Sequence, residues 1–194
     1  MRTTKIYAQA GHPTKKLFLD NEVKDAKGMT EFMRAHQGMV KQCHDFLPIG
    51  LSDGKFYLPN RKKGNAISDI SGVWFIGGAM IPFVSEEESM RKVLKRETGF
   101  DIKLSRLKYL CRNRYYMNGK AQGGLAHDAR CDVYALPLTK EEIASIKLDP
   151  GEYEGGSLQP YGIREIEAIA DPFVRVIFFD LWYELNVRIP TLDY

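Results

Sequence analysis

The chain has 194 residues, of which 44% are hydrophobic and 11% aromatic, so it can build one sizeable core and two full domains are not expected. Its 28 basic and 25 acidic side chains leave a net charge of +3, which excludes the strong positive field of a protein that grips a nucleic-acid backbone. Any anionic ligand should therefore be small and locally bound. The cysteines, Cys43, Cys111 and Cys131, are odd in number and lack C-x-x-C spacing, which argues against a disulfide framework or a structural zinc and favours a reducing cytoplasm.

The amino-terminal part of the sequence is expected to be an arm, residues 1–28, ahead of a single domain, residues 29–194. Met1–Gly11 contains no apolar run of signal-peptide length, and no stretch of the chain approaches ~18 uninterrupted apolar residues, so we expect a cytoplasmic protein without a membrane span. The arm contains one predicted strand near Lys16–Asp20. Its apolar centre, Leu17–Leu19, would otherwise be exposed, so the arm should pack on another element or on a second copy in a homodimer.

The first elements of the domain are a predicted peripheral helix and a β-hairpin. Apolar residues recur at helical spacing from Thr30 to Cys43. Two extended runs follow, His44–Leu51 and Lys55–Pro59, and the Asp53-Gly54 pair between them is a strong signal for a hairpin turn. We therefore expect two antiparallel strands here.

A basic loop and a strand–loop–helix unit come next. The loop, Asn60–Ser71, leads into the apolar run Val73–Ile76, which predicts a buried strand. An irregular stretch then reaches Ser85, whose side chain can cap a helix over Glu86–Thr98. The acidic first turn of this helix suits its dipole, and Gly99 stands where a left-handed residue ends helices.

The rest of the chain predicts two strands, a short helix, a loop and a final helix. These are expected at Lys103–Tyr116, Ala129–Pro137, Lys140–Ile146, Asp149–Tyr161 and about Pro172–Leu185, respectively. The loop is rich in glycine and glutamate, and the final helix has a continuous apolar face.

The segment from Gly77 to Phe100 resembles the Nudix box. That pattern is a glycine, five residues, a glutamate, seven residues, then Arg-Glu-apolar-x-Glu-Glu-x-Gly-apolar. With Gly99 on its second glycine, Gly78 falls on its first without a gap, and Glu97 matches the last glutamate. The resemblance implies an α/β (α+β) Nudix fold, in which a mixed β-sheet is sandwiched between helices. It also implies a hydrolase acting on a nucleoside diphosphate derivative.

The box is degenerate at four positions. Val84 and Val93 replace glutamates, Arg96 replaces the penultimate glutamate, and Lys92 stands in place of the arginine. Because the helical glutamates of the family hold divalent metals, we expect this chain to bind at most one.

Among Nudix proteins, the pattern is most similar to the GDP-mannose mannosyl hydrolases, whose helix is also short of glutamates. These proteins carry a Trp-Phe pair before the glycines, and in this chain the pair is Trp74-Phe75. This resemblance implies a nucleotide sugar as substrate and substitution at the anomeric carbon. It implies one Mg²⁺, held by the Gly78 carbonyl and Glu97, and a general base on the late loop, where Glu152 and Glu154 are the candidates.

Three basic residues are candidates for holding the diphosphate. Arg61 matches an arginine that the family uses for this purpose, and a planar guanidinium suits it. If no metal binds, Lys92 and Arg96 could neutralise the diphosphate themselves. The alternative for these two is a salt-bridged helix in which they pair with Glu88 or Glu97.

Two rival functions are weighed against the hydrolase. A catalytically inactive Nudix-like module that binds a nucleotide or a protein partner is favoured by Val84, Val93 and Arg96, because none of them can take a glutamate's role. RNA binding through Arg61–Lys63 and Arg112–Tyr116 is argued against by the near-neutral charge.

Overall fold

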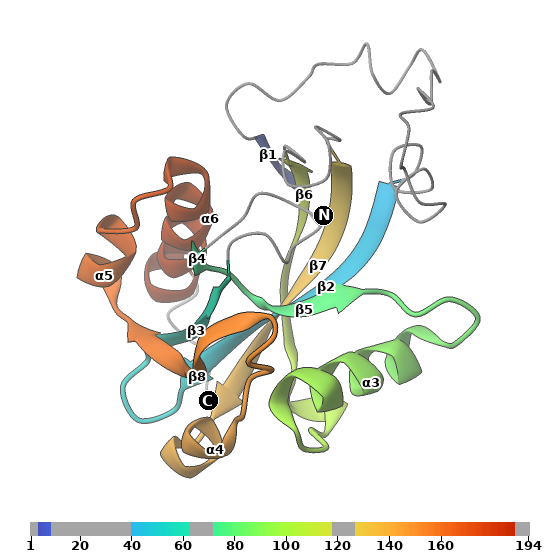
Figure 1. Cartoon of the computed structure of the whole chain (residues 1–194). Helices are drawn as coiled ribbons and strands as arrows, with labels where there is room; N and C mark the ends of the chain where they lie inside the picture. Colours follow the sequence, from blue (N-terminus) through green and yellow to red (C-terminus); the bar gives the residue numbers. More distant parts are fainter. Residues whose placement is uncertain (1–3, 9–39, 63–71, 118–126, 189–194) are drawn as a thin grey trace, which may run out of the picture.

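The computed structural model describes residues 4–8, 40–62, 72–117 and 127–188, which form a mixed β-sheet with helices on both faces (Figure 1). The strands are β1 (Thr4–Ala8), β2 (Val40–Gly50), β3 (Phe56–Arg61), β4 (Gly72–Val73), β5 (Ile76–Ala79), β6 (Lys108–Met117), β7 (His127–Leu138) and β8 (Tyr153–Tyr161). The helices are α3 (Glu86–Thr98), α4 (Lys140–Ser145), α5 (Ile163–Glu167) and α6 (Pro172–Tyr183), with a 3-10 turn at Leu104–Arg106 and a π-helical turn at Glu184–Arg188.

Strand β2 is the centre of the sheet. On one side it runs parallel to β7, which pairs antiparallel with β6, and β6 runs parallel to β1. On the other side, two different strands pair with successive parts of β2. Residues 43–46 pair with β5 and Ile49 pairs with Phe56 of β3, which continues to β4 and β8. Residues 43–50 are all buried, as expected of a strand covered on both faces.

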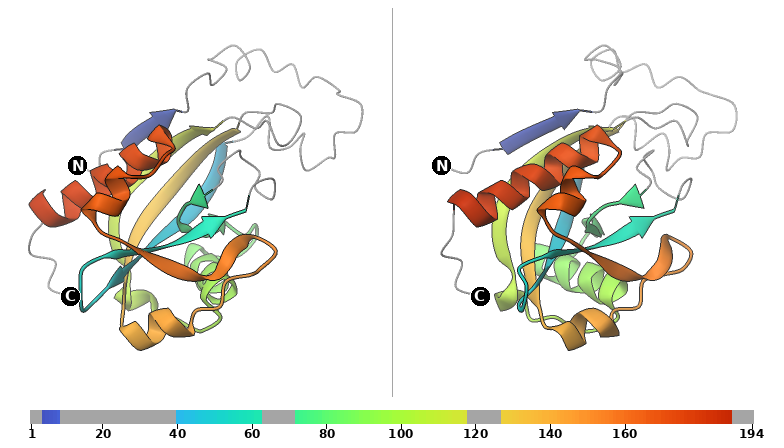
Figure 2. Two further views of the ribbon diagram at one scale, coloured as in Figure 1. Left: turned by 60° about the vertical axis from the view of Figure 1, so that its left-hand side comes forward. Right: turned by 90° about the vertical axis from the view of Figure 1, so that its left-hand side faces the viewer.

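The two faces of the sheet carry separate hydrophobic cores. Helices α5 and α6 cover one face, and α3 lies on the other (Figures 1 and 2). Because side chains alternate along β2, Leu47 joins Phe178 of α6 in the first core, whereas Phe46 joins Leu94 of α3 in the second. The glycines that follow Ile76 belong to β5, which contacts α3.

Most of the predicted regular elements are confirmed. The hairpin joins β2 to β3, with Gly54 at a φ of 65° in its turn. Helix α3 has the predicted bounds: Ser85 accepts a hydrogen bond from the Glu88 amide, and Gly99 has a φ of 82°. Helices α4 and α6 begin at the predicted residues, Lys140 and Pro172.

Two predicted elements are wrong. The helix expected to end at Cys43 cannot include Val40 or the residues after it, because residues 40–43 are extended in β2 and pair with β7. Residues 30–39 lie outside the described residues. The loop expected over Asp149–Tyr161 contains strand β8, in which Tyr153 and Leu158 are buried between exposed residues. In both places pairing with a distant strand decides the backbone conformation.

The strand predicted at Val73–Ile76 is divided into β4 and β5. Trp74 and Phe75, between the two strands, are buried, and their predicted place in the core is confirmed. The loop expected from Gly77 onward begins as part of β5. Helix α5 and the 3-10 turn ahead of β6 were not predicted.

Part of the predicted arm packs on the sheet. Strand β1 pairs with β6, Tyr7 is buried, and its hydroxyl donates to Asp180 of α6 at 3.0 Å. The strand predicted at Lys16–Asp20 lies outside the described residues. All three cysteines are free thiols. Within the described ranges, no helix has both the length and the apolar character needed to cross a lipid bilayer.

Candidate functional site

Helix α3 brings Glu97 into the second core at its last turn. The buried residues of this helix include Val93, Leu94 and Glu97. Glu97 is 5% exposed, although it is a carboxylate among apolar neighbours. Burying a charge is costly unless it is paired and hydrogen-bonded, so the partners of Glu97 are decisive.

Both carboxylate oxygens of Glu97 have donors. The hydroxyl of Tyr153, on β8, donates to Oε2 at 2.6 Å. The Nε atom of Arg96 donates to Oε1 at 2.9 Å, and its Nη2 atom donates to the same oxygen. Burial raises the pKa of Tyr153 and the adjacent Glu97 carboxylate raises it further, so the hydroxyl keeps its proton for this bond.

The guanidinium of Arg96 also reaches the glycine loop. Its Nη2 atom donates to the Gly77 carbonyl oxygen at 3.4 Å. A Cβ atom placed on Gly78 would lie 2.7 Å from Nη2, so a side chain at this position would displace the guanidinium from where it lies now. Arg96 therefore links the last turn of α3 to the end of β5.

Arg61, at the end of β3, adds a second guanidinium. Its Cζ atom lies 5.9 Å from the centre of the Tyr153 ring, within the range of a cation–π contact. We call Arg61, Arg96, Glu97 and Tyr153 the Glu97 cluster. It joins β3, β8 and the end of α3: Arg96 contacts the buried carboxylate of Glu97, and Arg61 contacts the ring of Tyr153.

The other predicted site residues lie at the rim of this cluster or outside it. Glu152 is exposed, and its Oε2 atom is 3.8 Å from Nη2 of Arg61. Glu154 is exposed on β8, on the other side of Tyr153 along the chain. Lys92 lies on the exposed face of α3, where its Nζ atom pairs with Glu88 at 2.7 Å. The structure thus brings Arg61, Arg96 and Glu97 together, with Glu152 beside them, and leaves Lys92 elsewhere.

The described residues do not fit a Mg²⁺ site in this arrangement. They contain no group of three or more His, Cys, Asp or Glu side chains that could hold a metal ion. Glu97 already accepts from Arg96 and Tyr153, and the main-chain carbonyl of Gly77 also accepts from Arg96. Val93, at the place of a family glutamate, is 0% exposed in the core and offers no oxygen.

Two buried polar residues of β2 adjoin the same glycines. His44 and Asp45 are the register partners of Gly78 and Gly77. Neither ring nitrogen of His44, nor Oδ2 of Asp45, has a hydrogen-bond partner among the described residues. Burial lowers the pKa of His44 and raises that of Asp45 to about 7. The signal for these residues in the sequence was a His-Asp pair inside an otherwise buried strand.

The run Arg112–Tyr116, a candidate for RNA contact in the sequence, lies in β6, and its two arginines form ion pairs within the sheet. Arg112 pairs with Asp132 at 2.7 Å and Arg114 pairs with Asp128 at 2.6 Å, both on the neighbouring β7. These ion pairs between neighbouring strands stabilise the pairing of β6 with β7, and both arginines already have carboxylate partners.

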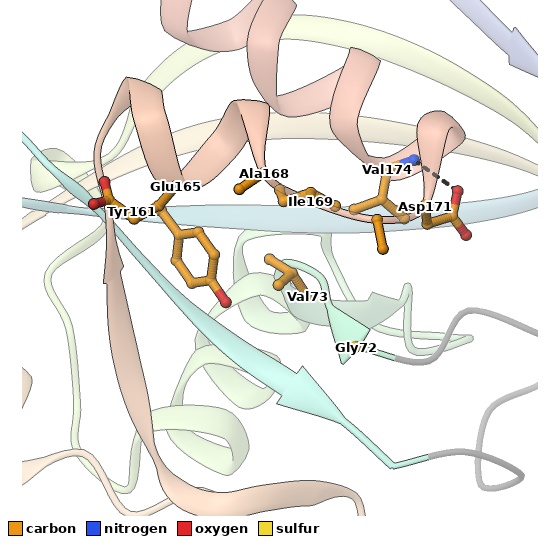
Figure 3. A pocket seen from close by; sticks show the side chains of 9 residues that line it. Gly72, Val73, Tyr161, Glu165, Ala168, Ile169, Asp171 and Val174 are labelled. Atoms are coloured by element: carbon orange, nitrogen blue, oxygen red, sulfur yellow. Dashed lines mark hydrogen bonds between the residues drawn. The ribbon is translucent and has the colours of Figure 1, made fainter.

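A cavity of about 410 Å³ lies on the other face of the sheet, beneath α5 and α6 (Figure 3). It is lined by Gly72, Val73, Tyr161, Glu165, Ala168, Ile169, Ala170, Asp171 and Val174. Its two acids serve local roles, since Glu165 accepts from the Gly162 amide and Asp171 caps α6. Gly72 is the register partner of Arg61, so the edge of the cavity meets the strand end that carries Arg61.

The fold is similar to that of solved Nudix structures. A MutT protein from Methanosarcina mazei matches 76% of this chain and 96% of its own, with a TM-score of 0.57 and 16% identity. A NUDIX hydrolase from Listeria monocytogenes, described as putative, matches 74% and 93%, with a TM-score of 0.51 and 13% identity. A MutT NUDIX hydrolase from Burkholderia pseudomallei matches 71% and 97%, with a TM-score of 0.51 and 15% identity.

No protein-family model matches the sequence, and no curated protein matches it. The structural similarity nevertheless shows that the chain has a Nudix fold, a mixed sheet between helices. At this low sequence identity the similarity concerns the fold alone, and the activity has to be inferred from the residues of the site.

Proposed function

We propose that this protein recognises a nucleoside diphosphate derivative, with a nucleotide sugar as the leading class, and hydrolyses it. The observation that supports the proposal is the convergence of Arg61 and Arg96 on the Glu97 cluster beside the glycine loop. A diphosphate carries several negative charges, and guanidinium groups bind phosphate oxygens with paired N–H donors. The likeness to solved Nudix hydrolases raises the expectation of hydrolysis by analogy of fold.

In the proposed reaction, Arg61 holds the diphosphate and Glu152 is the general base. Glu152 takes a proton from water, the water oxygen bonds to the anomeric carbon, and the bond from that carbon to the diphosphate oxygen breaks. The products are the free sugar and the nucleoside diphosphate, whose charge Arg61 counters. Glu152 is preferred to Glu154 as the base because its carboxylate lies beside Arg61.

A single Mg²⁺ on Glu97 and the Gly78 carbonyl would supply further positive charge to the leaving diphosphate. Such an ion would have to displace Arg96 from Glu97, because the guanidinium now contacts that carboxylate and the adjoining loop carbonyl. We therefore derive no step from the metal.

The test is a screen of nucleoside diphosphate derivatives with Mg²⁺ and with EDTA, following free phosphate, free sugar and melting temperature together. Binding to the native state raises the melting temperature even without turnover. We expect one substrate class to stabilise the protein and to yield product. If no compound in the screen gives either effect, the proposal is wrong.

Variants assign the roles. Arg61→Gln should weaken ligand binding by about tenfold or more, since it removes charge-assisted hydrogen bonds to phosphate. Arg91→Gln, which removes an exposed arginine of α3, is the matched control and should have no effect. Glu152→Gln should slow product formation by about 100-fold, the usual contribution of a general base, and Glu154→Gln should not. The reverse result would make Glu154 the base.

The second candidate is a binding module without catalysis. Arg96 favours this candidate because its guanidinium donates to both the buried carboxylate and the Gly77 carbonyl. Val93 favours it as well, because this side chain is buried in the core and cannot bind a metal. Stabilisation by a ligand with no product, under every metal condition, would support this module and exclude the hydrolase.

A further inference from the structure

Arg96 brings a positive charge to the Glu97 cluster. Its guanidinium contacts a carboxylate oxygen of Glu97, through Nε at 2.9 Å, and the main-chain carbonyl oxygen of Gly77, through Nη2 at 3.4 Å. Oxygens of these two kinds are also the protein ligands that Mg²⁺ selects. The guanidinium thus contacts the two oxygen atoms that a divalent ion at this place would need as ligands.

A cation beside a buried carboxylate lowers the cost of burying its charge. The side chain of Glu97 is 4% exposed, so water can contribute little to its solvation. The other basic residues in the second half of α3 are engaged elsewhere: Lys92 with Glu88 and Lys95 with Asp101. Within the described part of the chain, Arg96 is therefore the cation that pairs with Glu97.

A divalent ion at the same place would meet repulsion instead of support. It would lie against the positive charge of Arg96, and Val93, buried at the neighbouring position on the same face, offers no carboxylate to offset this charge. The Arg96 side chain remains 59% exposed, so its guanidinium can also meet an anion from solvent while it holds Glu97.

We propose that Arg96 is a built-in cation that takes the place of a divalent metal between Glu97 and the glycine loop, and that the site binds a diphosphate without metal. The first half stands on the geometry alone. The second half rests on the proposed function, since it supposes that a diphosphate is the ligand. The two halves are therefore tested by separate measurements.

The metal half is tested by titrating Mn²⁺ into the protein and following the signal of free Mn²⁺ by electron paramagnetic resonance. Wild type should show no site tighter than millimolar. Arg96→Glu, which puts a second carboxylate beside Glu97, should bind one Mn²⁺ at least tenfold more tightly. Lys95→Glu makes the same change of charge one residue earlier on the helix, away from Glu97, and should behave as wild type.

Arg96→Ala covers the case in which Arg96→Glu fails to fold, because it frees Glu97 without adding charge. It should bind Mn²⁺ more tightly than wild type, although less tightly than the glutamate variant. Tight Mn²⁺ binding by wild type would overturn the assignment. Equal and weak binding by wild type and by every folded Arg96 variant would overturn it as well.

The diphosphate half is tested by calorimetric titration with inorganic pyrophosphate in EDTA. Wild type should bind, and Arg96→Ala should bind about tenfold more weakly. A need for Mg²⁺ in wild type would overturn metal-independent binding. If pyrophosphate and the nucleotide panel both fail to bind under all conditions, the proposed function falls, while the Mn²⁺ titration still decides the role of Arg96.

Discussion

Glu97 and Asp45 both carry buried carboxyl groups, each residue is 5% exposed, and they lie on opposite faces of the sheet. Asp45 is the register partner of Gly77, and Arg96 links Glu97 to the same glycine. Glu97, on the α3 side, receives hydrogen bonds on both oxygens, from Tyr153 and from Arg96. Asp45, on the side of α6, has an oxygen without a hydrogen-bond partner in the described structure, and burial raises its pKa to about 7. The two carboxyl groups are therefore equally buried but differ in their hydrogen-bond partners.

The difference teaches that the partners of a buried carboxyl group, and not its exposure, decide what it does to the fold. A paired group costs little and fixes its neighbours in place, whereas an incompletely paired one avoids the cost of burial by taking up a proton. Here the paired carboxylate holds the end of α3 against β8. The raised pKa of Asp45 instead predicts that the stability of the folded protein depends on pH.

The largest expected effect is the pH dependence that Asp45 imposes. Its pKa in the folded state, about 7, is above the ordinary value of 3.8, so the folded protein binds an extra proton between these limits. The free energy of unfolding should therefore fall as pH rises from about 4 to 7, by up to roughly 4 kcal/mol, and should level off above pH 7. Urea unfolding at several pH values, for wild type and Asp45→Asn, measures the difference.

Asp45→Asn keeps the shape of the side chain and removes its titration, so the gap between the two unfolding curves should change across this range. Other titrating groups affect both proteins alike and cancel in the comparison. If the curves run parallel from pH 4 to 8, Asp45 does not change its proton uptake on folding.

An intermediate effect is expected from removing a donor of the paired carboxylate. Tyr153→Phe leaves Oε2 of Glu97 buried without its hydrogen bond, which should lower the free energy of unfolding by about 2 kcal/mol. Tyr57→Phe is the matched control, because its hydroxyl donates to the exposed Asp53 and its loss should cost less than about 0.5 kcal/mol. Equal losses in the two variants would contradict the role given to Tyr153.

The smallest effect concerns His44, the neighbour of Asp45 on the other face. Burial lowers its pKa, so its contribution to stability should grow as pH rises toward 6.5, the opposite slope to that of Asp45. His44→Phe keeps a ring beside Phe46 and Tyr134 and removes two unpaired nitrogens. We expect it to stabilise the protein by about 1 kcal/mol at pH 6 and by more under acid conditions. Destabilisation at pH 5 in chemical unfolding would show that His44 has a partner.

The sequence predicted elements whose signals are local. Helix α3 was placed correctly because its cap, Ser85, and its end, Gly99, act within one turn of the helix. Strand β8 was missed because Gly155 and Gly156 weaken its pattern, and only its pairing with β3 shows that the segment is extended. The same limit explains Val40, which was assigned to a helix although β7 holds it extended.

The candidate site could be predicted only in part for a related reason. The register of the glycines identified Arg96 and Glu97, and the expectation that Lys92 pairs along its own helix is confirmed. Tyr153 was not foreseen, because it reaches Glu97 from a strand 56 positions further along the chain. The salt-bridged alternative included a pairing of Arg96 with Glu97, but it expected partners one helical turn apart. The contact joins adjacent residues instead, and only a long side chain can bend back in this way.

The divided pairing of β2 has a consequence for the rate of folding. One edge of this strand is completed by β7, a parallel partner almost half of the chain away, and the other by the nearer β5 and β3. Closing a loop of that length costs entropy before any contact of β2 with β7 repays it. Refolding should therefore be slow for a chain of this size, on the order of milliseconds to seconds, with the β2–β3 hairpin formed ahead of the β7 edge.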